Sequence, residues 1–179
     1  MTKEIHLIDK TFVPYISEDK ILSRIKELGQ ELRLDYGTEN ILFLSVLNGS
    51  FMFTSDLMKE VTGEVELSFI KLSSYVGTST TGEVHELIGL NQDIEGKKIV
   101  IIEDIVDTGL TVDRVRTMLK MQNPSSVEVC TLLFKPDAFK GDSAPKYFGF
   151  EIPNKFVVGY GLDYDQLGRN LKEIYQLKE

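Results

Sequence analysis

The chain has 179 residues, of which 42% are apolar and 27% are charged, so we expect one globular domain that spans residues 1–179. Its formal net charge of −8 disfavours partners that are themselves polyanions, and we therefore expect neither nucleic acid nor a membrane surface as a partner. Cys130 is the single cysteine, which excludes an internal disulfide framework and favours a reducing compartment, the cytoplasm.

The first part of the chain alternates between helical and strand-like patterns. Apolar residues recur at helical spacing over residues 18–32, and Gly37 lies in the stretch that ends this helix. Residues 41–47 form a nearly continuous apolar run of strand length, followed by a loop at 48–50 and a helical pattern over 51–61. The sequence here predicts a strand, a tight loop and a helix.

The middle of the chain repeats this order after a polar interruption. Residues 65–72 read as a strand, and residues 73–86 are rich in Ser, Thr and Gly, so we expect a mobile loop there. The apolar run 99–102 predicts another strand, the acidic stretch 103–111 a loop, and residues 112–121 a helix that stops before a proline.

Two further strands are predicted at 126–134 and 155–162, and a weak helical pattern covers 164–177. Apolar strands that alternate with helices predict an α/β fold with a parallel sheet covered on both faces. Ligands bind beyond the carboxyl ends of such strands. The loops that should therefore converge are 47–50, 103–111, 135–139 and 159–169.

The segment 99–111, IVIIEDIVDTGLT, carries the chemistry of this predicted site. Glu103 and Asp104 follow a buried strand, where adjacent carboxylates are costly unless Mg²⁺ or ribose hydroxyls compensate them. Residues 107–111 combine a glycine, two hydroxyls and a helix start, whose donors suit a phosphate monoester. The alternative interpretation is a simple helix cap within 107–111, with both carboxylates solvated.

This segment resembles the ribose-phosphate motif of the type I phosphoribosyltransferases. Further matches, in the expected order, resemble the hypoxanthine-guanine phosphoribosyltransferase family: Leu47-Asn48-Gly49-Ser50, Ser74-Tyr75, Phe134-Lys135, the stretch FVVGYGLDY at 156–164, and Arg169. The resemblance implies the type I fold, a central mostly parallel sheet flanked by helices, with a small hood formed by the chain ends and a flexible lid loop. It also implies purine salvage: transfer of the 5-phosphoribosyl group from phosphoribosyl pyrophosphate to N9 of hypoxanthine or guanine.

The resemblance distributes the site residues over the two substrates. It assigns the ribose phosphate to Glu103, Asp104, Asp107, Thr108, Gly109, Leu110 and Thr111. It assigns the purine to Lys135, Phe156, Val157 and Asp163, and the pyrophosphate to Asn48, Gly49 and Arg169. It places Ser74 and Tyr75 in the lid loop, and the cofactor Mg²⁺ on Glu103, Asp104 and Asp163.

Two of these residues have roles that their chemistry supports. Asp107 is similar in position to the family's catalytic proton acceptor, which takes or holds a proton at the purine N7 while N9 attacks the sugar. The Lys135 ammonium can donate to the exocyclic oxygen of an oxopurine, whereas adenine presents a donor there. The ordinary structural alternatives are a snorkelling Lys135, Phe156 in the core, and Arg169 in a helix salt bridge.

Other functions remain open at this stage. A regulatory protein of the same fold that senses phosphoribosyl pyrophosphate and binds nucleic acid is one alternative, which the acidic charge disfavours. A phosphoribosyltransferase that prefers xanthine is another. Asn48 and Leu110 occupy positions that are basic in some relatives, so fewer side-chain cations face the pyrophosphate. The resemblance further suggests a homodimer or homotetramer.

Overall fold

The computed structural model describes residues 4–73, 85–88, 90 and 92–179. Its main sheet has six strands in the order β5-β4-β3-β6-β7-β8. Their bounds are β3 Ile41–Val46, β4 Val65–Ser73, β5 His85–Ile88, β6 Lys98–Val106, β7 Ser126–Phe134 and β8 Tyr147–Glu151. The five strands from β4 to β8 along this order are parallel, and β5 pairs antiparallel with β4 at the edge.

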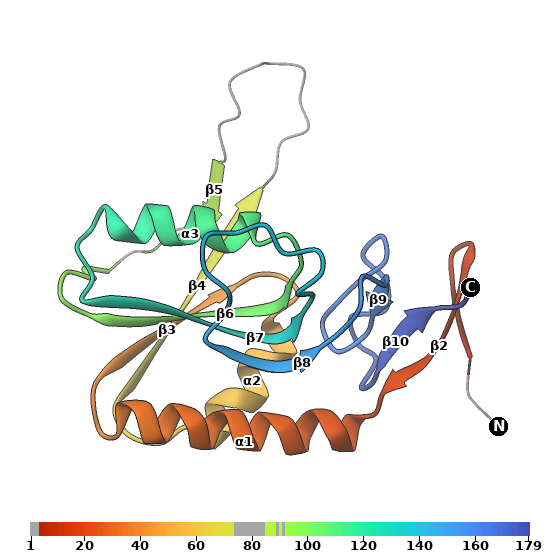
Figure 1. Cartoon of the computed structure of the whole chain (residues 1–179), viewed down its shortest axis with the longest axis horizontal. Helices are drawn as coiled ribbons and strands as arrows, with labels where there is room; N and C mark the ends of the chain where they lie inside the picture. The colour runs from red at the N-terminus through yellow and green to blue at the C-terminus, as the bar shows by residue number, and fades with distance from the viewer. Residues whose placement is uncertain (1–3, 74–84, 89, 91) are drawn as a thin grey trace.

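Helices cover both faces of this sheet, as the sequence predicts. Helices α1 (Glu18–Tyr36) and α2 (Phe51–Glu60) lie below the sheet in Figure 1, and α3 (Leu110–Lys120) lies above it. Each face has its own apolar core, because β3 and β6 are buried throughout their apolar parts and contribute alternate side chains to the two sides. The parallel sheet flanked by helices is thus confirmed.

A second, smaller sheet joins the two ends of the chain. Its strands are β1 (Ile5–Leu7), β2 (Lys10–Ile16), β10 (Ile174–Leu177) and β9 (Val157–Val158), all antiparallel. It stands beside one end of the main sheet, with both termini on its outer side (Figure 1). This is the hood that the family resemblance implies.

Several boundaries differ from the sequence-based expectation. The helix predicted at 164–177 is wrong: Asp165 and Gln166 have positive φ angles, and the chain turns before it enters β10. The predicted strand at 155–162 shrinks to the two residues of β9, because Gly159, Tyr160 and Gly161 all have positive φ. The remaining differences concern the acidic stretch and the start of α3.

Strand β6 continues through that stretch to Val106 instead of ending before Glu103. Its register against β7 pairs Glu103 with Thr131 and Val106 with Phe134, so the two carboxylates belong to the ladder. Helix α3 also begins two residues earlier than expected, at Leu110. The true loop is therefore only residues 107–109, which places the acidic pair and the helix start close together.

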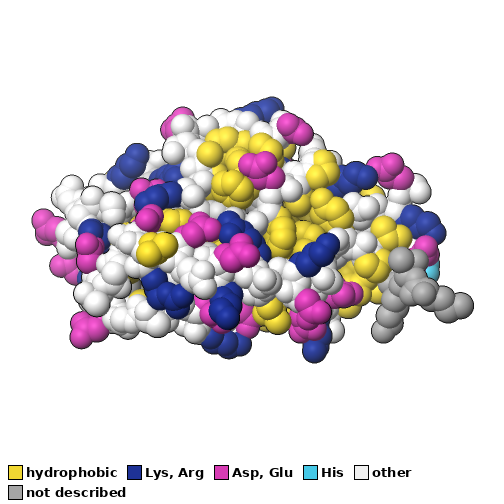
Figure 2. Space-filling view, turned by 60° about the horizontal axis from the view of Figure 1, so that its bottom comes forward, with side chains coloured by type: hydrophobic (Ala, Val, Ile, Leu, Met, Phe, Trp, Pro, Cys, Tyr) yellow, Lys and Arg dark blue, Asp and Glu magenta, His cyan; other side chains and the backbone are white. Residues whose placement is uncertain are grey.

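The outer surface agrees with the overall acidic charge. On the face shown in Figure 2, basic and acidic side chains are interspersed, with hydrophobic groups between them. No helix within the described part of the chain is long and apolar enough to cross a membrane.

Candidate active site

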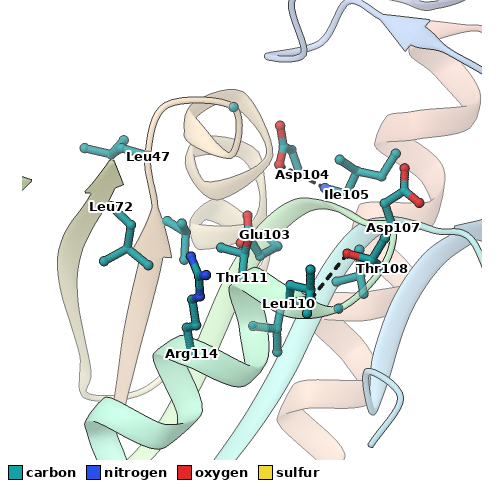
Figure 3. A pocket seen from close by; sticks show the side chains of 15 residues that line it. Leu47, Leu72, Glu103, Asp104, Ile105, Asp107, Thr108, Leu110, Thr111 and Arg114 are labelled. Atoms are coloured by element: carbon teal, nitrogen blue, oxygen red, sulfur yellow. Dashed lines mark hydrogen bonds between the residues drawn. The ribbon is translucent and has the colours of Figure 1, made fainter. Parts of the chain in front are cut away.

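The carboxyl ends of β3, β4 and β6 meet at one edge of the sheet and open into a pocket of about 380 Å³ (Figure 3). Its walls come from the end of β3 and the following loop, the end of β4, and the whole turn from β6 into α3. The lining residues are Val46, Leu47, Gly49, Leu72, residues 103–112 and Arg114. Of the four loops predicted to converge, 47–50 and 103–111 therefore line this pocket, and Gly161 of 159–169 packs against Gly49.

The loop after β3 is held by buried hydroxyls. The Ser45 Oγ lies 2.8 Å from the Ser50 Oγ and 2.7 Å from the Thr54 Oγ1, and Ser50 donates to the carbonyl of Val46 at 2.5 Å. All three hydroxyl side chains are buried. They tie the end of β3 to the start of α2, and so fix the course of the short loop between them, which contains a cis peptide bond between Leu47 and Asn48.

Glycines allow the backbones around the pocket to approach one another closely. A Cβ on Gly49 would lie 1.6 Å from the Asp104 Oδ2, and a Cβ on Gly161 would lie 2.0 Å from the Gly49 carbonyl oxygen. Gly109 has φ +87° as the residue before α3, and a Cβ there would meet the Phe139 ring at 2.5 Å. No larger residue fits these three positions without displacing the loops.

The turn from β6 into α3 presents backbone donors to the pocket. The Asp113 N–H already bonds the Gly109 carbonyl at 3.0 Å, whereas Leu110 N–H makes only a long contact of 3.5 Å with the Thr108 Oγ1. The first-turn N–H groups of a helix that have no backbone acceptor favour an anion. This geometry suits a phosphate group.

The adjacent carboxylates on β6 carry an electrostatic cost. Burial, with the charge of Asp104 beside it, raises the pKa of Glu103 well above its ordinary value. Burial also raises the pKa of Asp104 to about 6, although the Ile105 N–H donates to its Oδ1 at 2.9 Å and opposes the shift. A divalent cation or a ligand rich in donors would relieve this cost.

A second cavity of about 240 Å³ adjoins the first and shares Asp104, Ile105 and Asp107 with it. Its further walls are Lys135, Phe156, Val157, Leu162 and Asp163. The Lys135 Nζ lies 2.8 Å from the Asp107 Oδ2 and 3.4 Å from the Asn154 Oδ1. Lys135 is 6% exposed, so a buried cation and a half-exposed carboxylate stand at the junction of the two cavities.

The outer wall of this second cavity comes from the hood. Phe156 is 45% exposed and contacts the rings of Phe12 and Tyr164, with centroids 6.1 Å and 5.8 Å away. Asp163 pairs with Arg169 at 2.7 Å, and Arg169 also donates to the Gly161 carbonyl at 2.9 Å. The hood thus offers an aromatic face and an internally paired acid and base.

Comparison with known proteins agrees with this geometry. Residues 16–165 match the family model of the phosphoribosyl transferase domain. The chain is 42% identical to the hypoxanthine phosphoribosyltransferase of Haemophilus influenzae over 160 residues, which are 87% of this chain and 89% of that protein. A crystal structure of a hypoxanthine phosphoribosyltransferase from Staphylococcus aureus superposes with a TM-score of 0.86 at 43% identity, covering 92% of this chain and 90% of that one.

The chain belongs to the hypoxanthine-guanine phosphoribosyltransferase family. A third relative, the hypoxanthine phosphoribosyl transferase of Trypanosoma cruzi, superposes with a TM-score of 0.86 at 34% identity, covering 97% of this chain and 95% of that one. The type I fold is therefore shown by sequence and by structure together. Members of this family use Mg²⁺ with phosphoribosyl pyrophosphate.

Most residues that the sequence assigns to this phosphoribosyltransferase site line one of the two cavities. Those of 103–111, the purine set and Gly49 do so, whereas Asn48 and Arg169 are absent from both linings, and Asn48 is exposed. Ser74 and Tyr75 lie outside the described residues, as does most of the predicted lid loop. Among the described residues, no group of three or more His, Cys, Asp and Glu side chains is arranged as a metal site, and Asp163 is paired with Arg169.

Two residues of the phosphoribosyltransferase site escaped the sequence reasoning. Arg114 lines the larger cavity, and its position three residues after Thr111 on a helix was the signal that could have revealed it. Asn154 contacts Lys135, but it lies between a proline and a lysine in a connecting turn and offered no such signal.

The raised pKa of Asp104 predicts a trade between stability and ligand binding. Its charged form is disfavoured in the folded protein, so the cost is fully present above pH 6 and shrinks as the pH falls from 6 toward its ordinary value of 3.8. We expect Asp104→Asn to stabilise the ligand-free protein at pH 7.5 by on the order of 2 kcal/mol, or roughly 5 °C in Tm. Thermal unfolding at pH 7.5 and 5.0 measures this; a gain that does not shrink at pH 5.0 contradicts it.

Proposed function

We propose that the chain transfers the 5-phosphoribosyl group from phosphoribosyl pyrophosphate to N9 of hypoxanthine or guanine, giving IMP or GMP and pyrophosphate. One observation carries the proposal: the Lys135–Asp107 pair stands where the two cavities meet. It offers one donor and one acceptor, 2.8 Å apart, to a base that enters the smaller cavity while the sugar occupies the larger one.

The smaller cavity has the groups that an oxopurine requires. The Lys135 ammonium can donate to the exocyclic oxygen of hypoxanthine or guanine, and Asp107 can hold a proton at N7. Phe156 offers its exposed ring for stacking, and Val157 offers its backbone to the edge of the base. Because the ammonium presents only donors, adenine, whose amino group is also a donor, is rejected.

The larger cavity suits the sugar phosphate and its leaving group. We assign the 5-phosphate to the donors of residues 108–111, and the ribose hydroxyls to Glu103 and Asp104. We assign the pyrophosphate to the backbone at Asn48 and Gly49 and to Arg169. As pyrophosphate leaves, these donors stabilise the charge that develops on its oxygens. We assign the exclusion of water from the reaction centre to the lid loop with Ser74 and Tyr75, which lie outside the described residues.

The carboxylates of the two cavities also suit Mg²⁺. The ion is commonly held by one or two carboxylates together with substrate phosphates, so the absence of a three-carboxylate cluster in the described residues is no obstacle. Glu103 and Asp104, whose raised pKa values reflect uncompensated charge, would hold it, with Asp163 on the far side of the smaller cavity. When bound, Mg²⁺ supplies positive charge to the leaving pyrophosphate.

We further propose that residues 1–179 act as one catalytic domain in a homodimer or homotetramer in the cytoplasm. The hood uses both chain ends and supplies Phe156 and Asp163 to the site, so neither end is dispensable.

The proposed assembly has an exposed apolar surface available to it. Val65, Leu67 and Phe69 of β4 are exposed apolar residues on one face, which is typical of a surface that another subunit covers. The single cysteine is buried in β7, as suits a reducing compartment.

The decisive assay incubates the purified protein with phosphoribosyl pyrophosphate, Mg²⁺ and one base at a time, and detects the nucleotide product. We expect IMP and GMP from hypoxanthine and guanine, and no AMP from adenine. A faster reaction with xanthine would replace the proposal with a xanthine-preferring enzyme. No nucleotide from any of the four bases would refute the proposed reaction.

Asp107→Ala tests the proton acceptor. We expect kcat to fall by 10²-fold or more, the typical size of a general-base contribution, while the dissociation constant for IMP changes much less. Steady-state kinetics and calorimetric titration with IMP give the two values. Turnover equal to that of the unaltered enzyme would remove the role assigned to Asp107.

Lys135→Ala tests recognition of the base. Loss of the ammonium removes a charge-assisted donor, so we expect KM for hypoxanthine to rise by roughly 10- to 100-fold while KM for phosphoribosyl pyrophosphate changes little. Lys26→Ala, an exposed position on α1, is the matched control and should leave both constants unchanged. An equal rise in both constants for Lys135→Ala would contradict a role specific to the base.

A further inference from the structure

Arg114 is a cation in the larger cavity that the proposed roles above do not use. It lies on α3, one turn after the helix begins at Leu110, and it lines the cavity together with the acidic end of β6. In Figure 3 its side chain runs from α3 into the space between Leu72 of β4 and Glu103 of β6. A long side chain on an exposed helix face thus extends into the pocket instead of away from it.

The charges of this cavity are unbalanced without Arg114. Three carboxylates line it, those of Glu103, Asp104 and Asp107, and Arg114 is the only lysine or arginine among the described lining residues. Asn48 in the loop after β3 and Leu110 at the start of α3 are neutral. A substrate with several phosphate charges therefore meets Arg114 as the principal protein cation on this side.

Arg114 is also free to bind, whereas the other two cations near the site are engaged. Lys135 is paired with Asp107 at 2.8 Å and Arg169 with Asp163 at 2.7 Å. Arg114 forms no hydrogen bond or ion pair with any residue in the described part of the chain. An anion that binds it does not have to break a contact with another side chain first, although it must displace the water around this exposed guanidinium.

Its position distinguishes the two phosphate groups of the substrate. The donors suited to the 5-phosphate lie at residues 108–111, at the very start of α3. Arg114 lies one turn further on, and its guanidinium lies between Leu72 at the end of β4 and Glu103 of β6, on the side of the cavity that the ends of β3 and β4 form (Figure 3). That side of the cavity carries the loop assigned to the pyrophosphate.

We propose that Arg114 binds the pyrophosphate group of phosphoribosyl pyrophosphate. This inference rests on the proposed function, because it assigns a residue to that substrate. The guanidinium presents paired N–H donors that match phosphate oxygens. It contacts the substrate directly and stabilises the negative charge that grows on pyrophosphate as the bond to the sugar breaks.

Arg114→Gln tests this assignment, with Lys120→Gln as a control that removes one positive charge from the same helix outside the cavity. Calorimetric titrations at fixed Mg²⁺ use three ligands: pyrophosphate, phosphoribosyl pyrophosphate, and IMP, which carries the 5-phosphate but no pyrophosphate. We expect Arg114→Gln to weaken the first two by about 10-fold, the loss of one charge-assisted contact, and IMP by less than twofold. Arg114→Lys should restore part of the loss, and Lys120→Gln should change none of the three.

The outcomes separate this inference from the proposed function. If the unaltered protein forms no nucleotide and does not bind phosphoribosyl pyrophosphate, the proposed function fails and the inference falls with it. If the unaltered protein is active and Arg114→Gln binds all three ligands normally, Arg114 is a solvated surface residue and only this inference fails. A loss for IMP as large as that for pyrophosphate would place Arg114 at the 5-phosphate and overturn the assignment.

Discussion

The ion pair between Lys135 and Asp107 is the interaction on which the arrangement of the site depends. Strands β6 and β7 are parallel neighbours, and the Lys135 N–H bonds the Val106 carbonyl at 3.0 Å, so the residues that follow both strands emerge at the same level. A lysine that is 6% exposed requires a partner, and here the partner is the carboxylate at the junction of the two cavities. A base that enters must offer Lys135 an acceptor and Asp107 a donor to compensate for opening the pair, which is the pattern of an oxopurine with a proton at N7.

The buried carboxylates of the same region destabilise the empty protein and favour binding of a cation. Register against β7 keeps Glu103 and Asp104 within β6, where burial raises both pKa values. A Cβ on Gly49 would overlap the Asp104 carboxylate, so the loop after β3 lies this close to Asp104 only because residue 49 is glycine. The charge of Arg169 lowers the pKa of Asp104 but does not cancel the effect of burial, so the site favours cations that arrive with the substrate. The free energy that burial of these carboxylates costs in the empty protein is recovered when the metal and the substrate bind.

The sequence predicted the parts of the structure that a local signal determines. Strands β3, β6 and β7 are apolar runs buried on both faces, and their alternation with helices leads directly to the parallel sheet. The hood could be inferred only from family resemblance. Strand β9 has two residues and β10 four, and both are too short to show the alternation of apolar and polar residues that marks a strand. The helix expected at 164–177 failed because positive φ at Asp165 and Gln166 and the pairing of β10 with β2 override a weak helical pattern. Within the site, the motif 99–111 and Lys135 were predictable, whereas the contact of Asn154 with Lys135 depends on tertiary structure.

The most direct test of the central claim is a crystal structure of the protein with hypoxanthine, Mg²⁺ and pyrophosphate. The account predicts that the base lies in the smaller cavity against Phe156, with the Lys135 Nζ about 3 Å from its exocyclic oxygen and an Asp107 carboxylate oxygen about 3 Å from its N7. The Lys135–Asp107 pair would then be opened or reoriented around the base. A base bound elsewhere, with this pair still closed as it is in the ligand-free protein, would contradict the account.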